Sequence, residues 1–315
     1  MTTPYPLPDL ADLADALARG GSDLALGGVV PQARALAFAA LARHGWPRAR
    51  CLVVVPHLVD APELVAGLAL LAPQLRARAV PAECAAPYQG SEPPLAARLE
   101  LVRLLAAVEE RAVDVLVAPV RALPAPLPEP STVAAATVAL ALGEVVDTRR
   151  LAGDLTVAGY RRADLVEEAG DFAVRGLVVD VHRGDDHAWR IQLDDDRVEV
   201  IRRFDPASQR SLGEPVDRLV LPPLDPFGIE ADPATLARRL APDYPELAAA
   251  AGEGAERRLW SGACHLAAAW RRWTDLAGEL VVCDRDEVLG ELGRWLAVQR
   301  REWRTLAERT LPLPP

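Results

Sequence analysis

At 315 residues, the chain is long enough for two domains and has room for three. Half of its residues are hydrophobic and a quarter are charged, which is typical of a soluble globular protein with a sizeable core. The formal net charge of −10 argues against a protein that wraps nucleic acid with its overall surface, and leaves only a local basic patch open.

The cysteines and the N-terminal residues indicate in which cellular compartment the protein is expected. The four cysteines are scattered and form no Cys-x-x-Cys pair: Cys51, Cys84, Cys264 and Cys283. This spacing disfavours a zinc site or a disulfide framework and favours a reducing environment. The first residues lack the basic start and apolar core of a signal peptide, and no apolar run is long enough to span a bilayer. We therefore expect a cytoplasmic protein that has no membrane partner.

Buried-type strands alternate with helices in the first part of the chain. Continuous apolar runs at 51–56 and 114–119 are typical of strands that are covered on both faces of a parallel sheet. Apolar spacing and helix breakers predict helices near 9–19, 31–44, 61–71 and 94–110, and a short strand near 77–80. This alternation predicts an α/β fold with a mostly parallel sheet.

The composition changes at the Pro-rich segment 123–132, which predicts a linker. A strand over 135–142 and a helix capped by Asp147 are expected next. From 159 to 212, short apolar bursts separated by glycines and aspartates predict an antiparallel meander of about four strands. Within 188–193 apolar and polar residues alternate, so one face of that strand should be buried.

After the meander the chain returns to α/β character. A helix near 233–241, a buried-type strand at 278–283 and a long helix from 286 to 309 are expected. The sequence therefore predicts one α/β domain that is interrupted by a small α+β insertion. We expect the boundaries at 1–122 for the first part, 123–215 for the insertion and 216–315 for the returning part.

The meander also resembles a known family. Its residues run Gly-Tyr-Arg-Arg at 159–162, Gly-Asp-Phe-Ala-Val-Arg-Gly at 170–176, Arg-Ile at 190–191 and Ile-Arg-Arg-Phe-Asp-Pro at 201–206. This ordered series is similar to domain 2 of the UvrB-homology module that opens the bacterial transcription-repair coupling factors, Mfd. The resemblance implies a RecA-like domain, degenerate in its phosphate loop, split into parts 1a and 1b around domain 2. It is looser at 86–100 and fades after about residue 225.

The loop before residue 36 is where a nucleotide would bind such a fold. A phosphate loop needs glycines, a lysine and a Ser or Thr hydroxyl. Here the stretch begins at Gly28 and carries Ala33, Arg34 and Ala35 at the positions of the second glycine, the lysine and the hydroxyl. Arg34 alone could still touch a phosphate, but a vestigial strand-to-helix turn is the better interpretation. We expect no cofactor, no nucleotide binding and no ATPase activity, so the chain is not predicted to be an enzyme.

The resemblance also allows a prediction about nucleic acid binding. UvrB carries an aromatic-rich hairpin that clamps damaged DNA, between the counterparts of Tyr88 and Arg98. Nine residues separate these two positions here, too few for that hairpin. Little or no direct nucleic acid binding is therefore expected.

Two arginines of the meander are flanked by apolar residues, Arg175 in Val-Arg-Gly and Arg190 in Trp-Arg-Ile. An arginine held on a strand presents a rigid fork to a partner carboxylate. The residues alone slightly favour the alternative, a salt bridge within the domain to Glu167, Glu168 or Asp180. The resemblance implies instead that both arginines contact UvrA, the damage-recognition ATPase. Each is then expected to lie on the exposed side of its strand, beside Gln192 and Asp194, and to be replaceable by alanine with little change in melting temperature.

The resemblance adds a third partner-binding position, at Asp194. The family has Phe-Phe where this chain has Leu193-Asp194, so an acid replaces the aromatic anchor. Asp194, Asp195 and Asp196 could together bind a divalent cation. A solvated hairpin tip is the favoured interpretation, and no metal is expected.

Three classes of function stay open at this point. The first is a non-catalytic module that recruits UvrA. The second is a scaffolding or autoinhibitory module that acts on the remaining domains of a coupling factor, or a stand-alone relic without UvrA binding. The third is an active nucleotide hydrolase, which the altered phosphate loop disfavours. In the family, helicase motors and an RNA-polymerase-binding domain follow this region, and these 315 residues contain neither.

Overall fold

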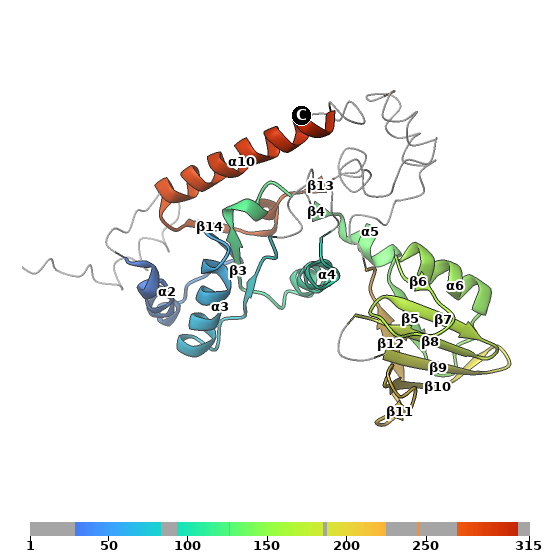
Figure 1. Cartoon of the computed structure of the whole chain (residues 1–315). Coiled ribbons are helices and arrows are strands. Elements are labelled where there is room, and N and C mark those ends of the chain that lie inside the picture. The colour runs from blue at the N-terminus through green and yellow to red at the C-terminus, as the bar shows by residue number, and fades with distance from the viewer. Residues whose placement is uncertain are drawn as a thin grey trace, which may run out of the picture. The chain divides into compact units, whose positions relative to one another are not determined.

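The computed structural model describes residues 29–82, 93–125, 127–184, 188–224, 245 and 270–307 (Figure 1). The chain divides into two compact units, one made of residues 1–85, 107–126 and 271–298, the other of 86–106, 127–270 and 299–315. Helices α4 (Leu95–Glu109) and α10 (Arg285–Ala307) contribute residues to both. The helices expected near 9–19 and 233–241, and Gly28, Cys84 and Cys264, lie outside the described residues. The division of the chain expected from the sequence, at residues 123 and 216, stays a prediction.

A four-stranded parallel sheet forms the centre of the first unit. Its strands are β14 (Glu279–Val282), β1 (Cys51–Val55), β3 (Val115–Pro119) and β2 (Ala77–Ala79), in that order. Every neighbouring pair is parallel, and Cys51 aligns with both Glu279 and Val115. All residues of β1 and β3 are buried, as expected for inner strands covered on both faces. The predicted α/β fold, with the runs near 51–56 and 278–283 in one sheet, is confirmed.

Two helices pack against one face of this sheet. The 3-10 turn η1 (Pro31–Ala33) leads into α2 (Arg34–Arg43), and α3 (Asp60–Leu71) follows β1. Phe38 of α2 and Leu68 of α3 are buried in one cluster with Val53 and Val117 of the strands. The start of α3 therefore lies at the carboxyl end of β1, the edge where open α/β sheets bind ligands.

The expected Pro-rich linker contains regular structure. The 3-10 turn η3 (Val120–Ala122) precedes it, and the segment itself contains the short strand β4 (Leu127–Pro128) and the start of α5 (Pro130–Ala135). Proline suits the first helical turn because its fixed φ matches the helix and its missing N–H is not needed there. The C-terminal part adds β13 (Trp270–Arg271) and the 3-10 turn η4 (Trp273–Leu276). Within the described ranges, none of the helices has the length and apolar character needed to cross a membrane.

The second unit contains a six-stranded sheet. Its order is β11 (Ser211–Leu212), β10 (Arg197–Phe204), β9 (Ala188–Asp194), β8 (Val178–His182), β7 (Asp171–Arg175) and β6 (Arg161–Arg162). All neighbours are antiparallel except β6 and β7. The predicted meander of four strands is confirmed as β7 to β10, and two short edge strands extend it. In β9 the predicted alternation is present, since Trp189, Ile191 and Leu193 are buried while Arg190 and Gln192 are partly exposed.

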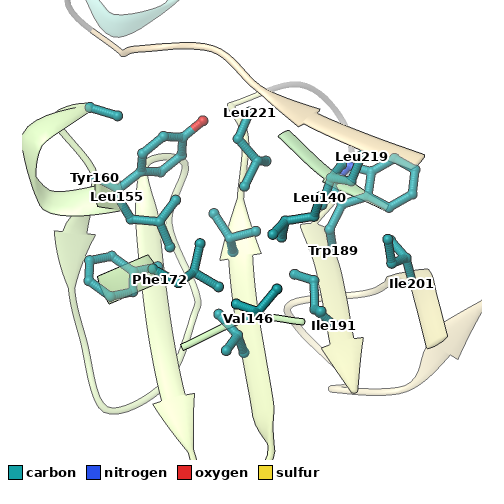
Figure 2. Packing of buried hydrophobic residues seen from close by; sticks show 14 of the residues in the cluster. Leu140, Val146, Leu155, Tyr160, Phe172, Trp189, Ile191, Ile201, Leu219 and Leu221 are labelled. Carbon is teal, nitrogen blue, oxygen red and sulfur yellow. The ribbon is translucent and has the colours of Figure 1, made fainter. Parts of the chain in front are cut away.

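One face of this sheet, here called the inner face, carries the core of the unit. Helix α6 (Thr148–Val157) and the antiparallel pair β5 (Val138–Ala141) and β12 (Arg218–Leu221) cover it. Figure 2 shows the side chains from these elements gathered in one layer, with Leu155, Leu140 and Leu219 against Phe172 and Ile191. Burial of this apolar surface is the main force that stabilises the unit. On the opposite face, here called the outer face, the described residues form no such layer of helix and strand.

The start of α6 gives a first testable prediction. Asp147 is its N-cap, and its Oδ1 accepts hydrogen bonds from the backbone N–H groups of Arg149 and Arg150, at 2.8 and 3.2 Å. These bonds, the one from Arg150 first, lower the pKa of Asp147. Asp147→Ala is expected to lower the melting temperature at neutral pH by roughly a few degrees, because two helix-start donors lose their acceptor.

The pH dependence of this effect follows from the sign of the pKa shift. A carboxyl whose pKa is lowered by folding contributes stability above its ordinary pKa of about 3.9, and loses it as the pH falls through the folded value. The difference in melting temperature between the variant and the unmodified chain should therefore shrink below about pH 4. A difference that stays constant down to about pH 2 would contradict the ionic cap.

Candidate functional site

The outer face of the six-stranded sheet carries the two arginines predicted from the sequence. The strand register places two rows of residues across β7, β8, β9 and β10: Ala173, Asp180, Arg190 and Arg202 in one row, and Arg175, Val178, Gln192 and Val200 in the next. Residues directly opposite each other on one face of a sheet have neighbouring side chains. The sheet therefore brings Arg175, Arg190 and Asp180 together. This agrees with the alternative that the two arginines form salt bridges to Asp180 within the domain.

Part of the outer face is covered. Val166, Ala173, Ala188 and Phe204 are buried together in a small cluster. Gln209 is hydrogen-bonded to this cluster, since its Nε2 donates to the carbonyl oxygens of Val166, a member of the cluster, and of Pro206, at 3.2 and 2.7 Å. The row of Arg175, Val178, Gln192 and Val200 remains at least partly exposed. We call this row, together with Arg202 and Asp194, the open half of the outer face.

Asp180 is the centre of an ionic cluster. Its side chain is 1% exposed, and Arg190 binds it with both prongs of its fork, Nε to Oδ1 at 2.7 Å and Nη2 to Oδ2 at 2.9 Å. Nη2 of Arg175 donates to the same Oδ2. The alternative of a salt bridge to Asp180 is therefore confirmed for both arginines, whereas Glu168 pairs with Arg161 instead. A buried carboxylate is tolerable only when it is paired and hydrogen-bonded in this way.

The two arginines differ in how strongly the domain holds them. Arg190 is 15% exposed; its Nη1 also donates to the carbonyl of Gln209 at 3.1 Å, and its guanidinium lies 4.6 Å from the centre of the Phe204 ring. The hydrogen bond with Asp180 raises the pKa of Arg190, so the side chain stays charged. Arg175 is 45% exposed. Both arginines therefore lie on the expected side of their strands, but Asp180, Gln209 and Phe204 enclose Arg190, whereas Arg175 is exposed.

Asp194 lies at the end of β9, where the chain turns into β10. Its partner across the hairpin is Arg197, and Asp195 between them has a positive φ of 57°, which a tight turn requires. Asp194, Asp195 and Asp196 are all exposed. This geometry agrees with the solvated hairpin tip. In the part of the chain that the structure describes, no group of three His, Cys, Asp or Glu side chains could hold a metal ion.

Arg34 of the degenerate nucleotide loop is buried, 7% exposed, at the first residue of α2. Its Nη1 lies 3.3 Å from Oδ2 of Asp60, and its Nη2 donates to Asp284, which follows β14. Burial acts to lower the pKa of Arg34, but the hydrogen bonds and charges around it, Asp284 foremost, raise it overall. The Arg34 cation is therefore already neutralised by two carboxylates.

Ala35 packs between helices. A Cβ added to Gly67 of α3 would lie 2.6 Å from the Cβ of Ala35, so α2 and α3 approach each other very closely here. The position where a phosphate loop carries its hydroxyl is thus occupied by a helix contact. Ala33 ends the 3-10 turn before α2. Sequence reasoning missed Asp60, Asp284 and Gly67; the only signal was an acid shortly after each of two buried strands.

Comparison with known proteins identifies the part of the second unit that contains the antiparallel sheet. Residues 138–227 match the UvrB interaction domain. This range runs from β5 to just beyond β12 and includes the whole antiparallel sheet. The resemblance and the inserted, mostly antiparallel domain predicted from the sequence are thereby confirmed.

Three relatives illustrate the similarity. The chain is 32% identical to the transcription-repair-coupling factor of Helicobacter pylori (strain 26695) over 117 residues, which is 37% of this chain and 12% of that protein. For the coupling factor of Myxococcus xanthus the identity is 34% over 212 residues, 64% of this chain and 17% of the relative. UvrABC system protein B of Pasteurella multocida is 34% identical over 130 residues, 40% of this chain and 19% of the relative. The matched region is thus less than a fifth of the length of each of these relatives.

Proposed function

We propose that this chain is a non-catalytic interaction module that recruits UvrA through the open half of the outer face. The observation that carries the proposal is Arg175. It is 45% exposed and anchored to Asp180, and it lies within the segment that matches the UvrB interaction domain. The chain is also similar to proteins named transcription-repair-coupling factor and UvrABC system protein B, which supports a partner from the same repair pathway.

Arg175 has the physical properties of an interaction anchor. Its Nη2 is bound to Asp180, while its Nε and Nη1 bind none of the described residues. Beside it, Leu177 is 50% exposed, and Val178 and Val200 are partly exposed. An arginine fork fixed next to apolar surface loses little side-chain entropy on binding, and such residues are enriched among hot spots of interfaces.

The absence of catalysis is part of the proposal. Arg34 is occupied by Asp60 and Asp284, and Ala35 is packed against Gly67. Neither residue can then act as the lysine or the hydroxyl of a phosphate loop. We also infer a cytoplasmic location and little or no direct contact with nucleic acid, on the composition and charge of the chain.

The proposal predicts a large effect of Arg175→Ala on UvrA binding. The variant should bind UvrA from the same bacterium more than tenfold more weakly, since losing one partner of a desolvated charged pair costs about 2–5 kcal/mol. The melting temperature should change little, because Arg190 still neutralises Asp180. Isothermal titration calorimetry and a thermal scan measure the two quantities.

Arg150→Ala is the matched control for charge. Arg150 is 84% exposed on α6, the helix that covers the inner face, so the same charge is lost on the opposite side of the sheet. Its affinity for UvrA should equal that of the unmodified chain. Equal affinity in the Arg175 and Arg150 variants would reject the outer face as the binding site. The internal pairing of Arg175 with Asp180 would then favour the second function, a scaffolding or autoinhibitory module.

A further inference from the structure

Arg202 also lies on the outer face, directly opposite Arg190 in the β9–β10 pairing. The residue is partly exposed, but its Nε is buried and has no hydrogen-bond partner. No ion pair or hydrogen bond joins its side chain to any described residue. Buried donors in native proteins are nearly always paired, so this Nε–H needs an acceptor, which either water or a ligand group supplies.

The electrostatics of the outer face favour an anionic ligand at this point. Arg175 and Arg190 bind Asp180, and Arg202 lies opposite Arg190, so these four residues together carry a formal charge of +2. Besides Arg175, the neighbouring row holds Val178, Gln192 and Val200, which are uncharged. The chain as a whole carries −10, so this is a local basic patch on an acidic protein.

The kind of anion follows from the surroundings of the patch. The exposed acids Asp194, Asp195 and Asp196 lie at the hairpin tip of β9 and β10, the two strands that carry Arg190 and Arg202. A nucleic acid backbone brings many phosphates and would be repelled by this tip. A single carboxylate of a protein side chain matches one arginine fork in a partly apolar setting. The observations therefore favour an acidic side chain of a protein partner.

We propose that Arg202 receives a carboxylate of the protein partner and so adds an arginine contact beside Arg175. Arg190 already uses its Nε, Nη1 and Nη2 on Asp180 and Gln209. Arg202 offers its Nε and a neighbouring Nη as an unused fork. This assignment rests on the proposed recruitment of UvrA and names a specificity-determining residue within it.

The test compares Arg202→Met with Arg203→Met in the full chain. Methionine keeps the apolar stem and removes the charge. Arg202→Met should weaken UvrA binding about tenfold or more at low salt. Its melting temperature should stay equal or rise, because an unsatisfied buried donor is removed. Arg202→Lys should restore only part of the affinity, since an ammonium is a point charge without the Nε–H.

Arg203→Met is the control, because Arg203 is the next residue of β10 and stacks on Trp189 on the inner side of the sheet, 5.3 Å from the ring centre. Its affinity should stay within about twofold of the unmodified chain.

Equal weakening by both variants would overturn the assignment, since only overall charge would then matter. An Arg202 variant with full affinity, next to an Arg175 variant without it, would overturn this assignment alone. An unmodified chain that does not bind UvrA would reject the proposed function and this assignment together. Duplex DNA that displaces UvrA and binds more weakly to the Arg202 variant would show a phosphate site instead of a carboxylate site.

Discussion

Replacing Arg190 by methionine is expected to lower the free energy of unfolding of the antiparallel-sheet unit by about 3 kcal/mol, the lower end of the cost of breaking a buried ion pair. The substitution removes the two-pronged partner of Asp180, a carboxylate that is 1% exposed. Arg175 keeps one hydrogen bond to it, which is why the lower end applies. The sequence-based expectation that this arginine could be replaced with little change in melting temperature is therefore revised for Arg190. Hydrogen exchange of the β8 and β9 amides reports the stability of this unit separately.

A double-substitution cycle separates the ion pair from the rest of the packing. Asp180→Leu with Arg190→Met should recover most of the lost stability, because a packed apolar pair often replaces a buried ion pair without net cost. Asp180→Leu alone should stay destabilised, since Arg190 would be left among Gln209 and Phe204 without its carboxylate. An unchanged stability of Arg190→Met would show that Arg175 alone neutralises Asp180. Any loss of UvrA binding in the Arg190 variant has to be corrected for its unfolded fraction.

The regular elements of both units could be predicted from the sequence. The all-apolar run at 51–56 and the Gly/Asp punctuation of 159–212 are local signals, and they became β1 and the β7–β10 meander. The Asp147 cap is also a local signal, because its hydrogen bonds reach only two and three residues along the chain. Where a single stretch of sequence decides the structure, prediction succeeds.

The ionic clusters could not be predicted because they depend on register and on distant pairings. The sequence offered Glu167, Glu168 and Asp180 as partners for the two arginines, and only the β8–β9 register places Asp180 opposite Arg190. The partner of Arg34, Asp284, is 250 residues away along the chain. Arg202 gave no signal at all, since its distinguishing property is a buried, unpaired Nε.

The cluster around Arg34 leads to the second large expected effect. Arg34→Met should lower the free energy of unfolding of the parallel-sheet unit by about 2–3 kcal/mol. Asp60, 13% exposed, would lose its cation, whereas Asp284, 43% exposed, is partly compensated by water. Hydrogen exchange of the β1 amides measures this unit. An unchanged exchange rate would mean that Arg34 is free of Asp60 in solution and available to a ligand.

The contacts of Arg34 and Ala35 also lead to a prediction about nucleotide binding. Neither the unmodified chain nor Arg34→Met is expected to bind magnesium-ATP, because the loop lacks a lysine and a hydroxyl and the helix contact of Ala35 leaves no room for one. The triple variant Ala33→Gly, Arg34→Lys, Ala35→Thr restores the residue types of a phosphate loop. It should nevertheless be destabilised rather than activated, since the threonine would be pressed against Gly67, where α2 and α3 are already in close contact. Calorimetry with magnesium-ATP checks all three proteins, and saturable binding to the unmodified chain would overturn the non-catalytic assignment.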